Sequence, residues 1–287
     1  GWAALFAGMS RFVMDPLARW ALKDLSKHIK EASPQKTSSG MVGGTARQRK
    51  KVRVDEQAEN HGKPEIVSED VAKLRHKFVT SLWKFITYTF FVAYGLYAIS
   101  FESSWFWTPT KYHVLFPRGA LPDLLYWYYQ LETSYYVFSL LVIAWEPKMK
   151  DRTQMTVHHL VTITLLVTSY VGRMIKFGVP IMLLHDAADP FMELAKMFLY
   201  CGHESMANVS LGVFASTFIY FRNWVFPRHI IWTLYNHKDR ELYPYYKATL
   251  GSLCTLAALH VYWSALILRI AYKNLVGETT GDIREDD

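Results

Sequence analysis

Long apolar runs separated by short polar loops fill the sequence from residue 78 to residue 272 and limit what the chain can fold into. About 20 apolar residues in a helix cross a hydrocarbon layer of about 30 Å. The mean hydropathy of +0.03 would suit a soluble protein, but most of the charge lies outside these runs. The pattern therefore predicts an all-α, polytopic membrane bundle with six full spans, at residues 78–100, 121–145, 156–171, 177–200, 206–226 and 246–272.

A shorter apolar segment at the start of the chain carries Arg11, Asp15 and Arg19. These charges are too many for the middle of a span but are acceptable at its end, so this segment is interpreted as the end of a first span, about seven in all. The following segment is rich in Ser, Thr, Gly, Lys and Gln, which is typical of a flexible linker. The expected organisation is the end of a span at 1–20, a basic, partly flexible cytosolic linker at 21–70, a six-span domain at 71–272 and an acidic tail at 273–287.

Lys and Arg are distributed unequally over alternate loops. If residues 21–77 are cytosolic, that side carries 19 of them and the opposite side eight. Basic loops lie preferentially in the cytosol, which predicts this orientation. The net charge of +7 and the run RQRKKVR at 47–53 then indicate a cytosolic patch that faces anionic headgroups or an anionic ligand. Nucleic-acid binding is disfavoured because no recognition fold accompanies the patch.

Ionisable residues gather inside two of the predicted spans. His158 and His159 begin the run VHHLVTITLL, and LLHDAADP in the next span supplies His185, Asp186 and Asp189. Such residues are costly within a membrane, so they usually face a cavity and serve a function. A lone histidine would more often be a hydrogen-bonding residue between helices, but several polar groups at one level favour a reaction centre.

The short loop near residue 174 would place these two groups side by side. In an antiparallel hairpin, residues equally distant from the loop lie at the same level. This geometry pairs His158 with Asp189 and His159 with Asp186. Pro190 directly follows Asp189 and should kink the helix beside the site.

The stretch from residue 155 to residue 200, MTVHHLVTITLLVTSYVGRMIKFGVPIMLLHDAADPFMELAKMFLY, resembles the Lag1 motif of ceramide synthases. Its paired histidines, the SY at 169–170 and the HDxxD element occur in the order of that motif, which belongs to the TRAM-Lag-CLN8 (TLC) domain. The resemblance covers about residues 71–272. No homeodomain-like segment is visible.

The resemblance implies a multi-pass enzyme of the endoplasmic reticulum membrane that joins a fatty acyl group from acyl-CoA to a sphingoid base. The products would be a ceramide and CoA, with no cofactor and no metal, since acyl-CoA is itself a substrate. Its partners would be acyl-CoA, the sphingoid base and membrane lipid, with room for a homodimer or a small accessory subunit. By the same resemblance, the loop WTLYNHKDRELYP at 232–244 is where chain-length preference would be sought.

The residue types suit this chemistry. Imidazole can take the proton of an amine or attack a thioester itself, and a carboxylate can orient the imidazole. His158, with His159 as its support, is expected to meet the acyl carbon. The candidate catalytic residues are His158, His159, Asp186 and Asp189. The candidate substrate-binding residues are His185, Tyr170, Trp127, Tyr136, Arg222, Lys148, Lys150 and Arg152.

Several of these residues also have plainer interpretations. Trp127 and Tyr136 suit an interfacial belt or helix packing better than a substrate channel. Arg222 suits an anchor that reaches toward the membrane surface, with a carboxylate or headgroup partner as the alternative. Glu193 and Lys196 could simply pair with each other.

Two other classes of protein remain open. The first is a zinc-dependent lipid amidohydrolase, with His185, Asp189 and His158 as ligands. The second is a lipid carrier or sensor of the same domain family without catalytic activity. The complete set of histidines and aspartates favours the acyltransferase over the carrier.

Overall fold

All regular elements in the described part of the chain are helices. The computed structural model describes residues 1–23, 46–101, 103–112, 121–145, 151–238 and 245–276, with the side chains of 46–70 and of a few loop-end residues outside this description. The α-helices are α1 (Trp2–Met9), α2 (Asp15–Ala21), α4 (Ala46–Ser100), α5 (Ser103–Phe106), α6 (Asp123–Trp145), α7 (Arg152–Val171), α8 (Ile175–Asp186), α9 (Asp189–Tyr200), α10 (Glu204–Phe218), α11 (Trp232–Asn236) and α12 (Tyr246–Val276). Two π-helices, η1 (Ser10–Met14) and η3 (Ile219–Ile231), and a 3₁₀-helix, η2 (Pro109–Lys111), complete them.

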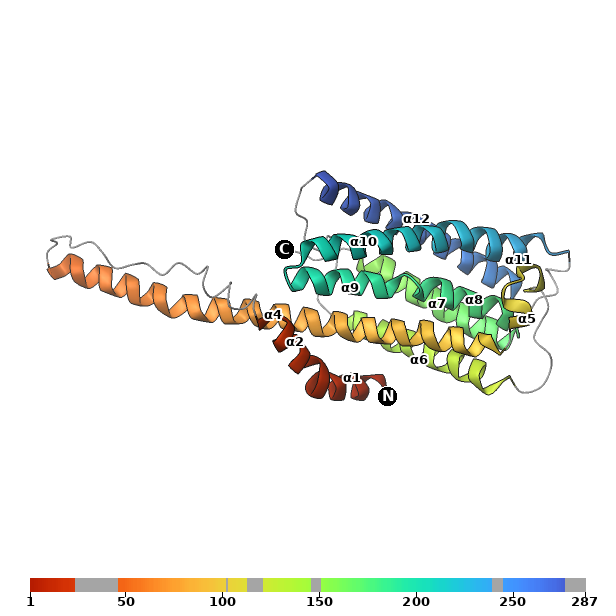
Figure 1. Cartoon of the computed structure of the whole chain (residues 1–287), viewed down its shortest axis with the longest axis horizontal. Coiled ribbons are helices and arrows are strands. Elements are labelled where there is room, and N and C mark those ends of the chain that lie inside the picture. Colours follow the sequence, from red (N-terminus) through yellow and green to blue (C-terminus); the bar gives the residue numbers. More distant parts are fainter. Residues whose placement is uncertain (24–45, 102, 113–120, 146–150, 239–244, 277–287) are drawn as a thin grey trace.

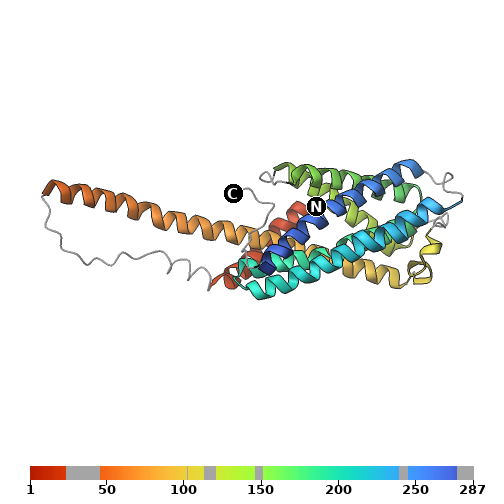
Figure 2. The same ribbon diagram turned by 90° about the horizontal axis from the view of Figure 1, so that it is seen from above.

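The long helices lie side by side along the long axis of the molecule (Figure 1). α4 packs on α9, α6 and α8, while α7 packs between α6 and α12. The N-terminal half of α4 projects beyond the bundle (Figure 2). From Ala46 onward, the segment expected to be a flexible linker is helical and forms the N-terminal part of α4.

The prediction of an all-helical bundle is confirmed. Four of the six apolar runs are continuous helices, in α4, α6, α7 and α12. Of the described helices, two segments, Val71–Ser100 and Tyr246–Lys273, are long and apolar enough by composition to cross a membrane.

The fourth apolar run is broken in the middle. α8 ends at Asp186, Ala187 and Ala188 form a turn, and α9 begins at Asp189 with Pro190 in its first turn. Proline has no N–H to continue the hydrogen bonds of a preceding helix, but it fits the first turn of a new one. The expected kink is thus a complete break, located within the candidate site.

The fifth run continues as one irregular helix. α10 passes into the π-helix η3, which contains Pro227 and leads into α11. π-helical turns change the direction in which side chains point and occur often at functional sites. Here η3 buries Arg222 inside the bundle.

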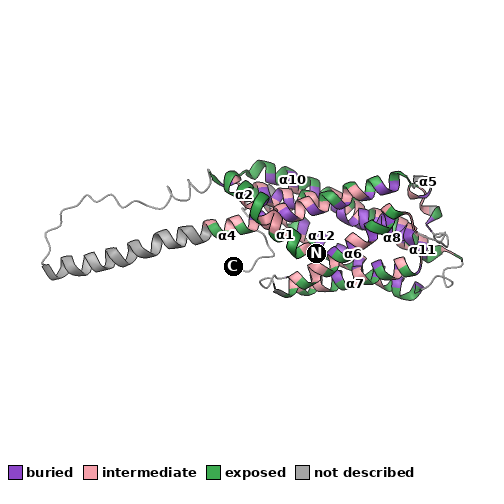
Figure 3. Ribbon diagram, turned by 90° about the horizontal axis from the view of Figure 1, so that it is seen from below, coloured by how far each residue is buried: buried purple, intermediate pink, exposed green. Residues whose placement is uncertain are grey.

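The core lies between α4, α6, α8 and α12. Its largest fully buried members include Phe91, Tyr128, Tyr129 and Leu256. Buried residues face the interior, and exposed residues lie along the outer edges of the helices (Figure 3).

A glycine allows α6, α7 and α8 to approach closely. A Cβ atom at Gly178 of α8 would lie 1.7 Å from the Tyr129 hydroxyl oxygen, far inside van der Waals contact. That hydroxyl is 3.4 Å from Ser169 Oγ on α7. Gly178 therefore sets the spacing of the helices that carry the candidate residues.

Candidate active site

Four histidines from three helices form one buried cluster. The His158 ring centroid lies 5.4 Å from that of His159 on α7 and 6.4 Å from that of His185 on α8. The His185 ring in turn lies 4.8 Å from the ring of His260 on α12. All four side chains are buried.

Hydrogen bonds fix the proton positions of two of these rings. His185 Nδ1 lies 2.6 Å from the Ile181 carbonyl oxygen, which can only accept, so this nitrogen carries a proton. The Nε2 atoms of His185 and His260 are 3.0 Å apart. In the neutral pair, His260 must donate to His185, whose remaining lone pair is thereby occupied.

The two neighbouring histidines of α7 are less constrained. His159 donates its Nδ1 proton to the Met155 carbonyl oxygen over 2.8 Å, which leaves its Nε2 able to accept. Among the described residues, no atom hydrogen-bonds to the buried Nδ1 of His158. In the described part of the chain, no hydrogen bond to Nδ1 therefore fixes which nitrogen of His158 carries the proton.

The expected histidine–aspartate pairs are not formed. Asp189 instead accepts a 2.6 Å hydrogen bond from Arg222 of η3, and no bond in the described part of the chain joins it to His158. Likewise, no described bond joins His159 to Asp186. The hairpin estimate assumed an unbroken helix, whereas the turn between α8 and α9 directs Asp189 toward η3.

Arg222 ties the break to its surroundings. It donates to the His185 carbonyl oxygen as well as to Asp189, and its guanidinium lies 4.5 Å from the centre of the Phe218 ring. Its side chain is only 7% exposed. The interpretation as a headgroup anchor is therefore wrong, and the alternative of a carboxylate partner is confirmed.

A second acidic side chain faces Asp186. Glu132 of α6 is fully buried, and neither of its carboxyl oxygens has a hydrogen-bond partner among the described residues. Farther along α9, Glu193 accepts a 3.1 Å bond from Lys196, as the simpler interpretation of these two residues expected.

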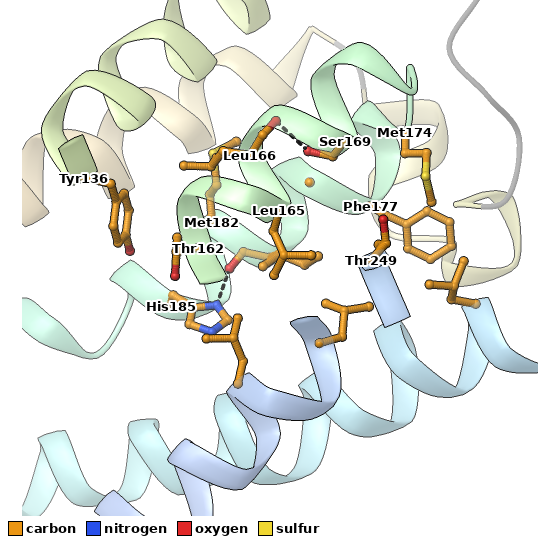
Figure 4. Close-up of a pocket in the computed structure, with 15 residues that line it drawn as sticks. Tyr136, Thr162, Leu165, Leu166, Ser169, Met174, Phe177, Met182, His185 and Thr249 are labelled. Atoms are coloured by element: carbon orange, nitrogen blue, oxygen red, sulfur yellow. Dashed lines mark hydrogen bonds between the residues drawn. The ribbon is translucent and has the colours of Figure 1, made fainter. Parts of the chain in front are cut away.

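An apolar pocket begins beside His185. Tyr136, Thr162 and His185 lie at one end, and Met174, Phe177 and Thr249 lie at the other (Figure 4). The wall between them is formed mainly by aliphatic side chains, namely Leu165, Leu166, Ile181, Met182, Leu253 and Leu256. Of the four clustered histidines, His185 lines this pocket and the other three do not, and the apolar wall suits an alkyl chain.

The structure separates the other predicted substrate-binding residues. Tyr136 lines the pocket, and its ring centroid lies 5.6 Å from that of His159. Tyr170 packs on Tyr129 at 5.7 Å and is not part of the pocket lining. Trp127 is 56% exposed on the outer face of α6, as the belt interpretation expected and contrary to a place in this pocket.

Of the three basic residues predicted to bind substrate near the start of α7, the structure describes Arg152. Arg152 donates a 3.0 Å bond to the Ala144 carbonyl oxygen at the end of α6. Lys148 and Lys150 lie outside the described residues. Arg152 thus has a structural role that its loop neighbours need not share.

Sequence reasoning missed three residues of the site. Glu132 and His260 are ionisable residues within predicted spans, so the rule that selected His158 would also have selected them. Trp263 contacts His158 with a ring-centroid distance of 5.3 Å. No signal in the sequence distinguished it from an ordinary core tryptophan.

The ligand set proposed for zinc does not converge. His185 Nε2 is directed to His260, and Asp189 is directed to Arg222, so these atoms do not point at one centre with His158. Within the described residues, no three His, Cys, Asp or Glu side chains are arranged to hold a metal ion.

The described part of the chain is thus a bundle of helices with four histidines buried in its interior. The family model described as the TLC domain matches residues 77–269, and the chain belongs to this family.

Curated relatives agree with this assignment. Ceramide synthase 4 of Homo sapiens is 32% identical over 222 residues, covering 76% of this chain and 56% of the relative. Ceramide synthase hyl-1 of Caenorhabditis elegans is 33% identical over 230 residues, covering 73% of this chain and 61% of the relative. Ceramide synthase LOH1 of Arabidopsis thaliana is 30% identical over 227 residues, covering 73% of each. The chain thus spans little more than half the length of the animal relatives.

Proposed function

We propose that this protein transfers a fatty acyl group from acyl-CoA to the amine of a sphingoid long-chain base. The products are a ceramide, in its dihydro or phyto form when the base is of that kind, and free CoA. The observation that carries the proposal is an apolar pocket lined by His185, whose ring centroid lies 6.4 Å from that of the buried His158. Relatives named ceramide synthase in a human, a worm and a plant support it.

The reaction needs little from the protein beyond positioning and proton transfer. The sphingoid base arrives as an ammonium ion, and its nitrogen must lose a proton before it can attack the thioester carbon. The C–N bond forms as the C–S bond breaks, the thiolate takes a proton, and one net proton leaves. An imidazole with a free nitrogen can accept the amine proton and deliver it to the sulfur.

His158 is the best candidate for this role. His185 has its Nε2 occupied by His260, whereas the Nδ1 of His158 has no hydrogen-bond partner among the described residues. The Nδ1 of His260 also lacks a partner there, but that ring is bonded to His185 through its Nε2. The same lone pair could attack the thioester and form an acyl-imidazole, which the amine would then open. His159 would support this ring from the adjacent position of α7.

The aspartates act through their neighbours in this proposal. Asp189 holds Arg222, which in turn binds the His185 carbonyl and stabilises the end of α8. Asp186 directly follows His185 and supplies a buried carboxyl group next to the cluster. The contact of Asp189 with Arg222 takes the place of the direct aspartate–histidine bond of hydrolase triads.

The membrane setting is part of the proposal. Six spans and the end of a seventh would place the enzyme in the endoplasmic reticulum membrane as a multi-pass protein. Acyl-CoA would approach from the cytosolic side, where Lys148 and Lys150 precede α7. A homodimer or a small accessory subunit is compatible with this arrangement.

A substrate panel tests the proposal directly. Purified protein would be incubated with acyl-CoAs of several lengths and with sphinganine, phytosphingosine or sphingosine, and the products identified by mass. We expect N-acyl sphingoid bases and free CoA in equal amounts, with activity retained after treatment with a chelator. Release of fatty acid from ceramide, together with loss of activity when a bound zinc is removed, would favour an amidohydrolase. Binding of lipid without turnover would favour a carrier.

A further inference from the structure

The ring of His158 is held by aromatic contacts and not by a carboxylate. Its centroid lies 5.3 Å from that of Trp263, with the two planes at 78°, and 6.3 Å from that of Tyr136. Edge-to-face contacts of this kind favour one relative orientation of two rings. Since Nδ1 of His158 lacks a hydrogen bond among the described residues, these rings are what orients it.

Trp263 is itself fixed at both its ring and its nitrogen. The side chain is 9% exposed and packs with Ala188 and Phe218 in a small core cluster between α10 and α12. Its indole nitrogen donates to Asp151 Oδ2 over 3.3 Å. The indole therefore cannot turn in its plane without losing a bond to a buried acid.

Asp151 occupies a position where a different bond would be expected. It is the N-cap residue of α7, and aspartate at this position usually accepts a bond from the backbone of the first helical turn. Here its side chain makes no capping bond, its Oδ1 has no hydrogen-bond partner in the described part of the chain, and it is 1% exposed. The carboxylate is thus directed to Trp263 instead of to its own helix.

The resulting contacts form a closed path. Asp151 is the N-cap residue of α7, His158 lies about two helical turns further along this helix, and Trp263 of α12 contacts both. A shift of α12 relative to α7 would therefore move Trp263 against the imidazole. The arrangement couples the orientation of His158 to the packing of two helices.

We propose that Trp263 and Asp151 are positioning residues that together hold the His158 imidazole in its reactive orientation, in the role that an aspartate bonded to the histidine has in hydrolase triads. This inference rests on the proposed acyl transfer at His158. Neither residue touches the substrate in this account, since both act through the orientation of the imidazole.

Paired substitutions test the inference. Trp263→Phe keeps an aromatic ring beside His158 but removes the N–H donor, and Asp151→Ala removes its acceptor. Asp151→Asn keeps an oxygen that can accept from the indole. Trp232→Phe, at an exposed position on α11, is the matched control. Each purified variant would be measured for kcat, for KM of both substrates and for Tm.

We expect Trp263→Phe and Asp151→Ala each to lower kcat at least tenfold, which corresponds to about 1.4 kcal/mol in the barrier. KM for both substrates should stay within about twofold, because the pocket is unchanged. The double variant should lose no more than the worse single variant, since both remove the same bond. Asp151→Asn should keep most of the wild-type kcat, and Trp232→Phe should keep all of it.

Three outcomes would overturn the inference. Losses that multiply in the double variant would show that the two residues act separately. Losses of kcat that follow Tm through the series, with Asp151→Asn as impaired as Asp151→Ala, would show only a structural bond. Unchanged kcat in an active protein would show that the bond has no role. Failure of the wild-type protein to form any N-acyl product is a different result, because it would reject the proposed function itself.

Discussion

Arg222 binds Asp189 across the break between α8 and α9, with a distance of 2.6 Å between Nη2 and Oδ1. The same guanidinium binds the carbonyl of His185. His185 directly precedes Asp186, which is the last residue of α8. One cation from η3 therefore joins the two halves of the broken helix. The site depends on this contact because the break directs both His185 and Asp189.

Substitution of Arg222 should reveal the importance of this ion pair for stability. Arg222→Met leaves the Asp189 carboxylate without its partner and should cost about 3 to 5 kcal/mol, the usual penalty for breaking a buried pair. Thermal unfolding in detergent would measure the loss. The double variant Arg222→Met, Asp189→Leu should be more stable than Arg222→Met alone, since it removes the stranded charge. Arg228→Met, at an exposed position of η3, serves as the control. Equal stability of Arg222→Met and Arg228→Met would contradict the importance of the pair.

Gly178 should not tolerate even alanine. The added Cβ would lie 1.7 Å from the Tyr129 hydroxyl oxygen, so Gly178→Ala must push α6 and α8 apart, at a cost of about 1 to 3 kcal/mol. Tyr129→Phe removes this oxygen and should recover part of the loss in the double variant. Gly212→Ala, where nothing lies within 4 Å of the added atom, should be neutral or slightly stabilising. A Gly178→Ala protein with wild-type Tm would show that the helices are not packed as closely as described.

Thr249 should limit the length of the acyl chain. It lies at the end of the pocket opposite His185 (Figure 4). Thr249→Phe would fill this end, so activity with the longest acyl-CoAs should fall while activity with shorter ones remains. Competition among acyl-CoAs of different lengths, read by product mass, measures the change. Thr255→Phe, at an exposed position on the same helix, should leave the profile unaltered. A uniform loss at every length would mean that the chain does not occupy this pocket.

Basic residues before α7 should contribute to acyl-CoA binding. CoA carries several negative charges, so Lys148→Gln with Lys150→Gln should raise KM for acyl-CoA and weaken its dependence on salt. KM for the sphingoid base should not change. Arg152 is left intact because it binds the Ala144 carbonyl. Equal changes in both KM values would indicate that these lysines serve the membrane surface.

The apolar runs were sufficient to predict helices but not where a helix breaks. The lengths of the apolar runs identified the C-terminal part of α4 and the helices α6, α7 and α12, because apolar length depends only on local sequence. The fourth run reads as one span, yet Pro190 and the contacts of Asp189 divide it. Whether a proline kinks or ends a helix depends on what satisfies the freed backbone groups, and here Arg222 of a distant segment does so.

The members of the site were easier to predict than their partners. Ionisable residues in apolar runs led to His158 and Asp189, since their burial needs a reason. Pairing them required the rotation of each helix about its axis, which the break after Asp186 alters. Trp263 could not be foreseen, because a tryptophan in a span has many uses and only the packing of α12 on α7 brings it to His158.

The most direct test of the account is the rate of ceramide formation by His158→Ala compared with that of the wild-type protein. Both would be purified in detergent and shown to have the same Tm, and His203→Ala, at an exposed position, would be the control. We predict that His158→Ala loses more than nine-tenths of the rate, a barrier change above about 1.4 kcal/mol, while His203→Ala keeps it. A folded His158→Ala protein that retains more than a tenth of the wild-type rate would contradict the assignment of this imidazole as the reacting group.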